Sequence, residues 1–209
     1  MCISNKVNKT LTPKGYYFKR AFDVSLALLG LVLSSPLWLL FSLAIYFEDP
    51  GPVLFFQDRC GEKSKPFKVI KFRTMWHKMG KRHEVVVIEN DPRVTKVGGI
   101  LRATAMDELP SLVNILKGDM SFVGPRAEPF KIGDEDIIAI PGFDTRCQVK
   151  PGLTGMAQVY APKDIDLRAK FRYDSMYIEK MSFWLDLKLI FLSFWVTFRG
   201  KWEHRGKKI

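Results

Sequence analysis

Residues 101–126, LRATAMDELPSLVNILKGDMSFVGPR, decide how we interpret this chain. Two adjacent acids, Asp107 and Glu108, stand directly before a run with a helical repeat. The apolar side chains at positions i, i+3, i+4 and i+7 share one helical face: Leu109, Leu112, Val113 and Leu116. We predict a helix that begins at the acid pair, with Pro110 in its first turn, where a missing N–H costs nothing, and that ends at Gly118.

The acid pair would then lie at the positive end of the helix dipole, which favours the ionised carboxylates. The same helix end offers free N–H groups to a phosphate. Arg102 and Arg126 stand on either side of the pair in the sequence. A carboxylate can attack an anion only where cations offset the repulsion between like charges, so this grouping fits a nucleophile. The simpler interpretation of a bare Asp-Glu pair, an acidic cap on a core helix, stays open.

The composition narrows the class of protein and of partner. Hydrophobic residues make up 47% of the 209 residues, enough for a core, which argues against general disorder. The net charge of +11 indicates an anionic partner: nucleic acid, acidic lipid or a phosphorylated substrate. Three widely spaced cysteines, without metal-ligand spacing, favour a reduced setting that faces the cytosol: Cys2, Cys60 and Cys147. The histidines are expected at the surface: His77, His83 and His204.

Residues 24–47 form an apolar run without a charge, long enough to cross a bilayer, which takes about 20 residues. Ser34, Ser35 and Pro36 interrupt it at the centre, where proline removes a helical hydrogen bond. Basic residues flank the run on both sides, and such residues mark cytoplasmic ends. A spanning helix would put one basic cluster on the wrong side. We therefore favour a re-entrant helix–break–helix, broken at Ser35-Pro36, over a mildly kinked spanning helix.

Two further segments have readable patterns. Residues 53–56 and 67–72 are predicted to be strands of a short hairpin, and at the end of the second stand Lys71 and Arg73, which by themselves fit a basic edge strand. Residues 181–198 are rich in Phe, Trp and Leu but too often interrupted by charge to cross a membrane. We predict an amphipathic helix in the membrane interface, with Trp184 and Trp195 at the headgroups; a buried core helix is the alternative.

Four blocks stand in a recognisable order behind the apolar segment: KVIKFRTM (68–75), MDELPSLVNILKGDMSFVGPRAE (106–128), VKPGLTGMAQV (149–159) and FRYDSMYIEKMSFWLDLKL (171–189). In these blocks the chain resembles the bacterial sugar transferases that load a polyprenyl phosphate, the monotopic phosphoglycosyl transferases. The resemblance covers nearly everything from residue 19 to 189. It departs at residues 160–162, where many members have NGR, and just before the PGLTG block, where members often carry more basic residues and only Arg146 and Lys150 remain.

The resemblance implies transfer of a sugar 1-phosphate from a UDP-sugar to a polyprenyl phosphate, expected to be undecaprenyl phosphate, with release of UMP. It implies Asp107 as the nucleophile of a covalent aspartyl intermediate. Glu108 would hold the metal or take a proton, and Mg²⁺ would be held by Asp107 and Glu108. Phosphate oxygens would be bound by Lys71, Arg102 and Arg126. It also implies that Asp23 pairs with a nearby cation, and it places the protein on the cytoplasmic face of the bacterial inner membrane, at the first membrane step of surface-glycan assembly.

We thus expect an α+β fold, mainly helical, in a monotopic membrane protein. It would comprise a polar tail (1–18), the broken membrane helix (19–49), a catalytic domain with interfacial helices (50–200) and a basic tail (201–209). The expected partners are the UDP-sugar, the polyprenyl phosphate and membrane lipid but no nucleic acid, with a homodimer left open. A non-enzymatic basic membrane protein that binds acidic lipid or nucleic acid is the alternative; it leaves the acid pair unexplained, and no nucleic-acid motif occurs.

Overall fold

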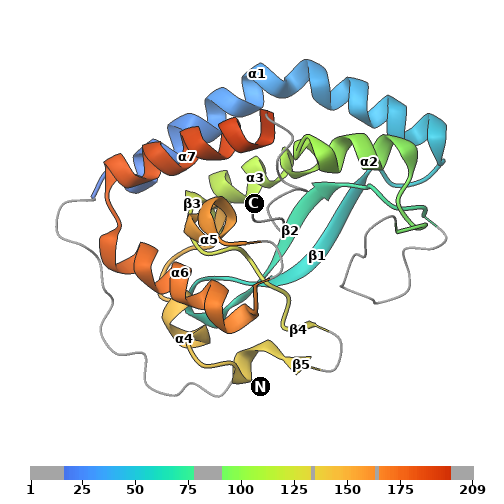
Figure 1. Cartoon of the computed structure of the whole chain (residues 1–209). Coiled ribbons are helices and arrows are strands. Elements are labelled where there is room, and N and C mark those ends of the chain that lie inside the picture. Colours follow the sequence, from blue (N-terminus) through green and yellow to red (C-terminus); the bar gives the residue numbers. More distant parts are fainter. Residues whose placement is uncertain (1–16, 78–90, 133–134, 163–164, 199–209) are drawn as a thin grey trace, which may run out of the picture.

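The computed structural model of the chain describes residues 17–77, 91–132, 135–162 and 165–198, which form a mainly helical α+β fold (Figure 1). The helices are α1 (Lys19–Glu48), α2 (Lys96–Ala103), α3 (Ser111–Lys117), α4 (Phe143–Arg146), α5 (Met156–Tyr160), α6 (Leu167–Lys180) and α7 (Phe183–Phe198), with 3-10 turns η1 (Glu62–Ser64), η2 (Met106–Glu108) and η3 (Ile137–Ala139). The strands are β1 (Leu54–Cys60), β2 (Pro66–Phe72), β3 (Ser121–Val123), β4 (Lys131–Ile132), β5 (Glu135–Asp136) and β6 (Gly152–Thr154). The predicted α+β class with mainly helical content is confirmed. The tail at residues 201–209 lies outside the described residues.

Helix α1 corrects the prediction of a break at Ser35-Pro36. It is one continuous helix of 30 residues with Pro36 inside it, and it arches over the rest of the fold (Figure 1). Proline has no N–H for the carbonyl of Val32 four residues before it. The hydroxyl of Ser35 donates a hydrogen bond of 2.8 Å to that carbonyl instead, so the helix can continue. Of the described helices, only α1 is long and apolar enough to cross a membrane.

The N-terminal end of α1 is fastened to the domain by buried polar contacts. The ammonium of Lys19 lies 2.5 Å from Asp186 of α7 and 3.9 Å from Asp23, as expected for Asp23. The Asp23 carboxylate also accepts a hydrogen bond of 3.1 Å from the backbone N–H of Phe122. The apolar outer side of α1 remains exposed, with Leu33 at 70%. The domain therefore holds α1 along one side only.

Helix α7 lies beside α1, with Asp186 turned inwards and several large aromatic side chains turned outwards. Asp186 and Leu189 are fully buried, and Phe22 of α1 packs edge-on against Phe183. The outer face is exposed at Trp184, Phe191, Phe194 and Trp195, and the charged Lys188 is exposed among them. One half of α7 thus belongs to the core, as the alternative of a buried core helix predicts for that face, and the other half is exposed. The placement of this exposed half in the membrane interface stays a prediction.

The predicted hairpin is confirmed and is longer than expected. Strands β1 and β2 pair antiparallel from Leu54–Phe72 to Cys60–Pro66. Helix α3 is docked on β2 by two buried side chains. Asn114 accepts a hydrogen bond of 3.0 Å from the N–H of Ile70 and donates one of 2.8 Å to the carbonyl of Lys68, and Ser111 donates one of 2.8 Å to the carbonyl of Ile70. These contacts fix the start of α3 beside Lys71.

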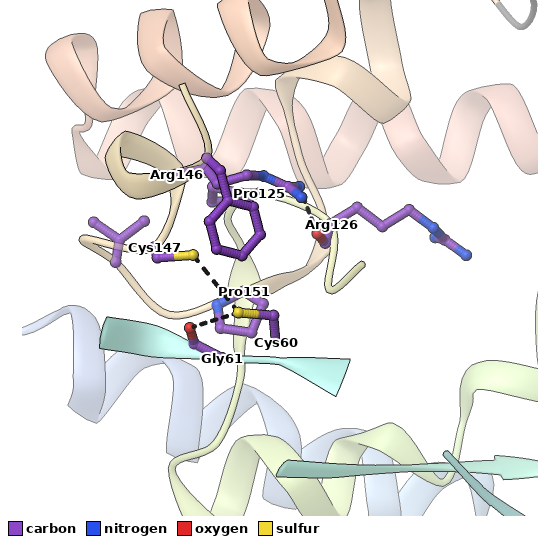
Figure 2. A pocket seen from close by; sticks show the side chains of 9 residues that line it. Cys60, Gly61, Pro125, Arg126, Arg146, Cys147 and Pro151 are labelled. Carbon is purple, nitrogen blue, oxygen red and sulfur yellow. Dashed lines mark hydrogen bonds between the residues drawn. The ribbon is translucent and has the colours of Figure 1, made fainter. Parts of the chain in front are cut away.

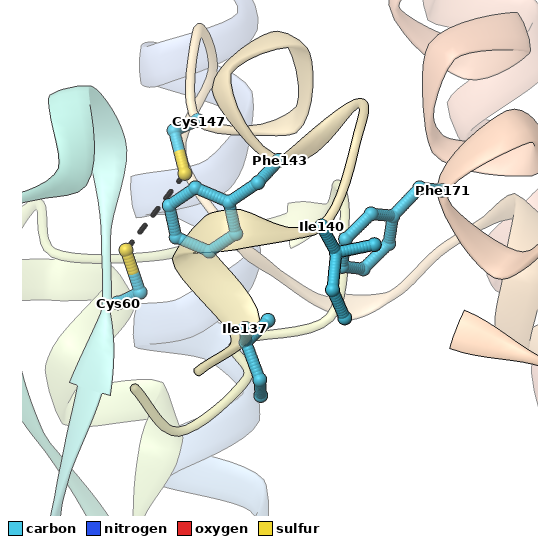
Figure 3. Packing of buried hydrophobic residues seen from close by; sticks show 6 residues of the cluster. All are labelled: Cys60, Ile137, Ile140, Phe143, Cys147 and Phe171. Atoms are coloured by element: carbon cyan, nitrogen blue, oxygen red, sulfur yellow. Dashed lines mark hydrogen bonds between the residues drawn. The ribbon is translucent and has the colours of Figure 1, made fainter. Parts of the chain in front are cut away.

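The C-terminal end of β1, at Cys60, contributes to a cluster of buried hydrophobic residues (Figure 3). Here the buried side chains of Cys60, Ile137, Ile140, Phe143, Cys147 and Phe171 pack together. Cys60 and Cys147 are widely spaced in the sequence, but their sulfur atoms lie 3.8 Å apart, and both cysteines are free. Cys2, His83 and His204 lie outside the described residues. This core connects the hairpin to α4 and α6.

Candidate active site

The acid pair lies in the 3-10 turn η2, between α2 and α3. This corrects the predicted helix start: α3 begins at Ser111, and Pro110 is its N-cap. The left-handed backbone of Ala105, with φ of 56°, turns the chain sharply just before the pair. The amides that follow donate within the turn, Glu108 to the carbonyl of Ala105 and Leu109 to that of Met106. The expected helix N-terminus is therefore not what holds the acids, and their environment comes from side chains.

Glu108 is held by two cations on one oxygen. The ammonium of Lys71 lies 2.5 Å from Oε1, and the guanidinium of Arg126 lies 3.3 Å from the same atom. Burial alone would raise the pKa of Glu108, but Lys71 and Arg126 lower it to about 2. Glu108 is thus a fixed anion at neutral pH, and it brings two cations to the site.

Asp107 is in a different electrostatic position from its neighbour. Burial and the adjacent charge of Glu108 raise its pKa to about 6, against the opposing effect of Lys71, Arg102 and Arg126. Among the described residues, no side chain forms an ion pair or hydrogen bond with its carboxylate. A half-buried carboxylate of raised basicity, without a direct partner and among three cations, is suited to attack an electrophile.

Arg102 faces the acid pair from the last turn of α2. Its Nε donates a hydrogen bond of 2.8 Å to the hydroxyl of Thr74, which follows β2. Burial lowers the pKa of Arg102, and Asp107 is the first group that opposes this effect. The structure therefore places Arg102 near Asp107 and places Lys71 and Arg126 on Glu108. All five residues predicted for the site come together.

The turn that carries Arg126 is built by close contact of two short strands. Strands β3 and β6 pair in parallel, and the N–H of Gly124 donates a hydrogen bond of 2.9 Å to the carbonyl of Thr154. A Cβ atom at Gly124 would lie 2.4 Å from the carbonyl oxygen of Lys150, and one at Gly152 would lie 2.1 Å from the nitrogen of Gly124. Both positions therefore need glycine so that the backbones can approach.

Arg59 is a site residue that was not among the residues predicted from the sequence. It lines a shallow pocket together with Lys71, Glu108 and Arg126. Its guanidinium donates 3.1 Å to the carbonyl of Ala127, and burial and the charge of Arg126 lower its pKa to about 10. The signal was the strand alternation: Arg59 and Lys71 share a face once the hairpin register is known.

The donor set can be compared with the needs of Mg²⁺. Among the described residues no group of three His, Cys, Asp or Glu side chains comes together, so a cage made only of protein ligands is not present there. Mg²⁺ often uses one or two carboxylates and completes its shell with water and substrate phosphates. Asp107 fits this role because its carboxylate has no direct partner, whereas Oε1 of Glu108 already contacts Lys71 and Arg126.

Comparison with known proteins identifies the family of the chain. The family described as bacterial sugar transferase matches residues 14–200. The chain belongs to this family. One relative is the UDP-glucose:undecaprenyl-phosphate glucose-1-phosphate transferase of Escherichia coli K12, 42% identical over 190 residues, which are 88% of this chain and 40% of that enzyme. The exopolysaccharide production protein PSS of Rhizobium leguminosarum bv. phaseoli is 38% identical over 182 residues, 83% of this chain and 91% of that protein.

A third relative is named for a different sugar. The UDP-N-acetylgalactosamine-undecaprenyl-phosphate N-acetylgalactosaminephosphotransferase of Aeromonas hydrophila is 39% identical over 191 residues, 90% of this chain and 45% of that enzyme. The chain thus spans less than half the length of the relatives from Escherichia coli and Aeromonas hydrophila. Their names share undecaprenyl phosphate and a UDP-sugar but not the sugar itself, so membership of the family does not identify the sugar.

Proposed function

We propose that this bacterial sugar transferase is a phosphoglycosyl transferase that moves a sugar 1-phosphate from a UDP-sugar to undecaprenyl phosphate and releases UMP. The observation that carries the proposal is the Asp107 carboxylate, which has raised basicity and no direct partner beside an anion already held by two cations. The names of the relatives from Escherichia coli and Aeromonas hydrophila support the substrate classes. The non-enzymatic alternative offers no use for such a carboxylate.

The reaction divides into two displacements at one phosphorus atom. In the first, an oxygen of Asp107 attacks the phosphorus next to the sugar; the new O–P bond forms while the bond to the UMP oxygen breaks, and UMP leaves with the electron pair. In the second, an oxygen of the lipid phosphate attacks the same phosphorus and releases the Asp107 carboxylate. The enzyme returns to its first state, and the products are UMP and the lipid-linked sugar diphosphate.

The cations around the pair would stabilise the charge that builds up in both steps. Lys71, Arg102 and Arg126 can donate to the equatorial oxygens of the transferred phosphoryl group and to the leaving phosphate. Glu108 keeps Lys71 and Arg126 in place through Oε1. Mg²⁺, held by Asp107 with Glu108 and substrate oxygens, would neutralise phosphate charge and polarise the P–O bond.

A membrane-bound acceptor requires a site at the membrane surface. Helices α1 and α7 lie side by side on the fold (Figure 1), each has exposed apolar side chains, and we assign these side chains to the lipid. The tryptophans Trp184 and Trp195 on the outer face of α7 suit the headgroup region. We further propose that α1 enters and leaves the bilayer from the cytoplasmic face, so that undecaprenyl phosphate reaches the site without crossing.

The test is a screen for UMP release over several UDP-sugars, with undecaprenyl phosphate and magnesium in detergent or vesicles. We expect release with at least one UDP-sugar and dependence on the lipid acceptor for turnover. Release of UMP at the same rate with water as the only acceptor would favour a phosphatase. No release from any UDP-sugar, together with salt-sensitive binding of nucleic acid, would favour the basic membrane-anchored alternative.

A further inference from the structure

The turn that carries Arg126 is held by its backbone carbonyls rather than by its side chain. The carbonyl of Pro125 accepts a hydrogen bond of 2.8 Å from the N–H of Gly152. The carbonyl of Arg126 accepts one of 2.6 Å from Nη2 of Arg146, and the carbonyl of Ala127 accepts one of 3.1 Å from Nη1 of Arg59. Three consecutive carbonyls, of residues 125–127, thus accept hydrogen bonds from three different segments of the chain.

Arg146 makes its contact from the side of the turn away from Glu108. Figure 2 shows its guanidinium at the carbonyl of Arg126, while the side chain of Arg126 extends away from it. Arg146 is the last residue of α4, and it lines a small pocket with Pro125, Cys60 and Cys147. Its side chain is only 5% exposed. Its side chain forms no hydrogen bond or ion pair with Asp107, Glu108 or Lys71, so any effect on the reaction must pass through the turn.

The orientation of Arg146 is itself fixed by α6. Its Nε donates a hydrogen bond of 3.0 Å to Oδ2 of Asp174, whose side chain is 2% exposed. The guanidinium also stacks on Phe171, with 4.4 Å between Cζ and the ring centroid. Because the guanidinium is planar and rigid, fixing Nε and the ring face also fixes where Nη2 points. The direction of the Arg126 carbonyl is therefore set by two residues of α6.

A buried ion pair is weak evidence for a role in stability, because a neutral pair of similar volume often folds as well. The particular gain from Arg146 is geometric. The side chain of Arg126 is 45% exposed and reaches Glu108 with one contact of 3.3 Å, so its backbone must be placed accurately for that contact to form. A displacement of about 1 Å at such a group can cost about 100-fold in rate.

We propose that Arg146, held by Asp174, is a positioning residue that places the Arg126 guanidinium on Glu108 and on the phosphate of the substrate. The proposal rests on the proposed function, because its kinetic consequence is read in UMP release. It assigns no contact between Arg146 and substrate. It concerns the turnover step more than the binding of the UDP-sugar, since Arg126 would act on charge that develops during phosphoryl transfer.

The first experiment separates positioning from folding. Arg146→Met and Asp174→Asn each leave one buried charge or donor without its partner and should lower Tm. The double variant Arg146→Met/Asp174→Asn removes both charges and should recover most of the Tm.

We expect kcat for UMP release in the double variant to remain about 10- to 100-fold lower than in wild type, with KM for the UDP-sugar changed by less than about threefold. Arg172, an exposed arginine on α6, the helix of Asp174, provides the matched control: Arg172→Met should have the Tm, kcat and KM of wild type. Wild-type kcat in the double variant would overturn the proposal.

The second experiment tests whether Arg146 acts through Arg126. In an Arg126→Met background, adding Arg146→Met/Asp174→Asn should lower kcat by less than about threefold, because the group being positioned is gone. Losses that multiply in full would overturn the proposal.

A third measurement does not depend on activity. Hydrogen exchange of the backbone amides in residues 121–128 should be faster in the double variant than in wild type and in Arg172→Met. Unchanged exchange would overturn the positioning role even if UMP is released. If wild type releases no UMP from any UDP-sugar, the proposed function fails. Faster exchange in the double variant would still support the role of Arg146 in holding the turn at Arg126.

Discussion

The ammonium nitrogen of Lys71 lies 2.5 Å from Oε1 of Glu108, although the two residues are 37 positions apart in the chain. The contact joins β2 to the turn before α3, and both side chains are only 18% exposed. A charge-assisted hydrogen bond in such a position is strong and directional. It holds one acid of the pair as a fixed anion and leaves the other, Asp107, for chemistry.

Replacing Lys71 by Met should lower kcat for UMP release by about 100- to 1000-fold, the cost of removing one donor to a developing oxyanion. Lys68→Met is the matched control, because Lys68 lies on the same strand with its side chain 67% exposed. Steady-state kinetics with one UDP-sugar would measure both. An equal loss in the two variants would mean that Lys71 contributes only general positive charge.

Replacing Asp107 by Asn should abolish turnover, because an amide oxygen cannot form the acyl phosphate. Glu108→Gln should reduce turnover strongly without abolishing the adduct, since it weakens the hold on Lys71 and Arg126. Asp58→Asn, an exposed carboxylate on β1, should behave as wild type. Incubation with a radiolabelled UDP-sugar and no lipid acceptor should label wild type and not Asp107→Asn. Full activity of Asp107→Asn would exclude this nucleophile.

The pH profile of UMP release should have an acidic limb near pH 6, where Asp107 titrates. Below that pH the carboxylate is protonated and cannot attack, so the rate should fall about tenfold per unit. Glu108, with a pKa of about 2, stays ionised throughout. Because magnesium favours an ionised carboxylate ligand, raising its concentration should move the limb to lower pH.

The raised pKa of Asp107 also has a consequence for stability. The contribution of Asp107 to the free energy of unfolding is fully present below pH 3.8, the ordinary pKa of an aspartate, and is lost as the pH rises through about 6. At neutral pH, Asp107→Asn should therefore be at least as stable as wild type. A thermal melt at two pH values measures this. A large loss of Tm in Asp107→Asn at neutral pH would contradict the assigned environment.

How much the sequence could predict depended on the range of each interaction. Strand alternation and the apolar repeat are local, so the hairpin with Lys71 and the helix after Pro110 were predictable. The break in α1 was predicted wrongly because the hydroxyl of Ser35 satisfies the carbonyl that Pro36 leaves open. The start of α3 was misplaced because the left-handed turn at Ala105, a residue with no turn preference, cannot be seen in the sequence.

Other site features depend on residues far apart in the chain. Arg146 contacts the carbonyl of Arg126 and the carboxylate of Asp174, which are 20 and 28 positions away. Arg59 reaches the carbonyl of Ala127 over 68 positions. No spacing rule connects such pairs, and a carbonyl has no residue identity to be recognised in a sequence. The sequence therefore indicates which side chains do chemistry more readily than which side chains hold them in place.

The course of α1 through the membrane can be tested at its two ends. A re-entrant α1 keeps Tyr17, which is 91% exposed, and the hairpin residue Lys65 on the cytoplasmic side. In a chain whose native cysteines are replaced by alanine, Tyr17→Cys and Lys65→Cys should both react with an impermeant maleimide in inverted membrane vesicles, and neither should react in intact cells. Reaction of the two positions from opposite sides would show a spanning helix.

Adding Pro36→Ala restores the N–H that the carbonyl of Val32 lacks and should favour a straight helix. A share of the chains should then expose Tyr17→Cys to reagent outside the cell. Ser35→Ala, which removes the hydroxyl but keeps the proline, should retain the wild-type labelling pattern at lower yield, because an unpaired carbonyl in lipid is costly whichever way the helix runs.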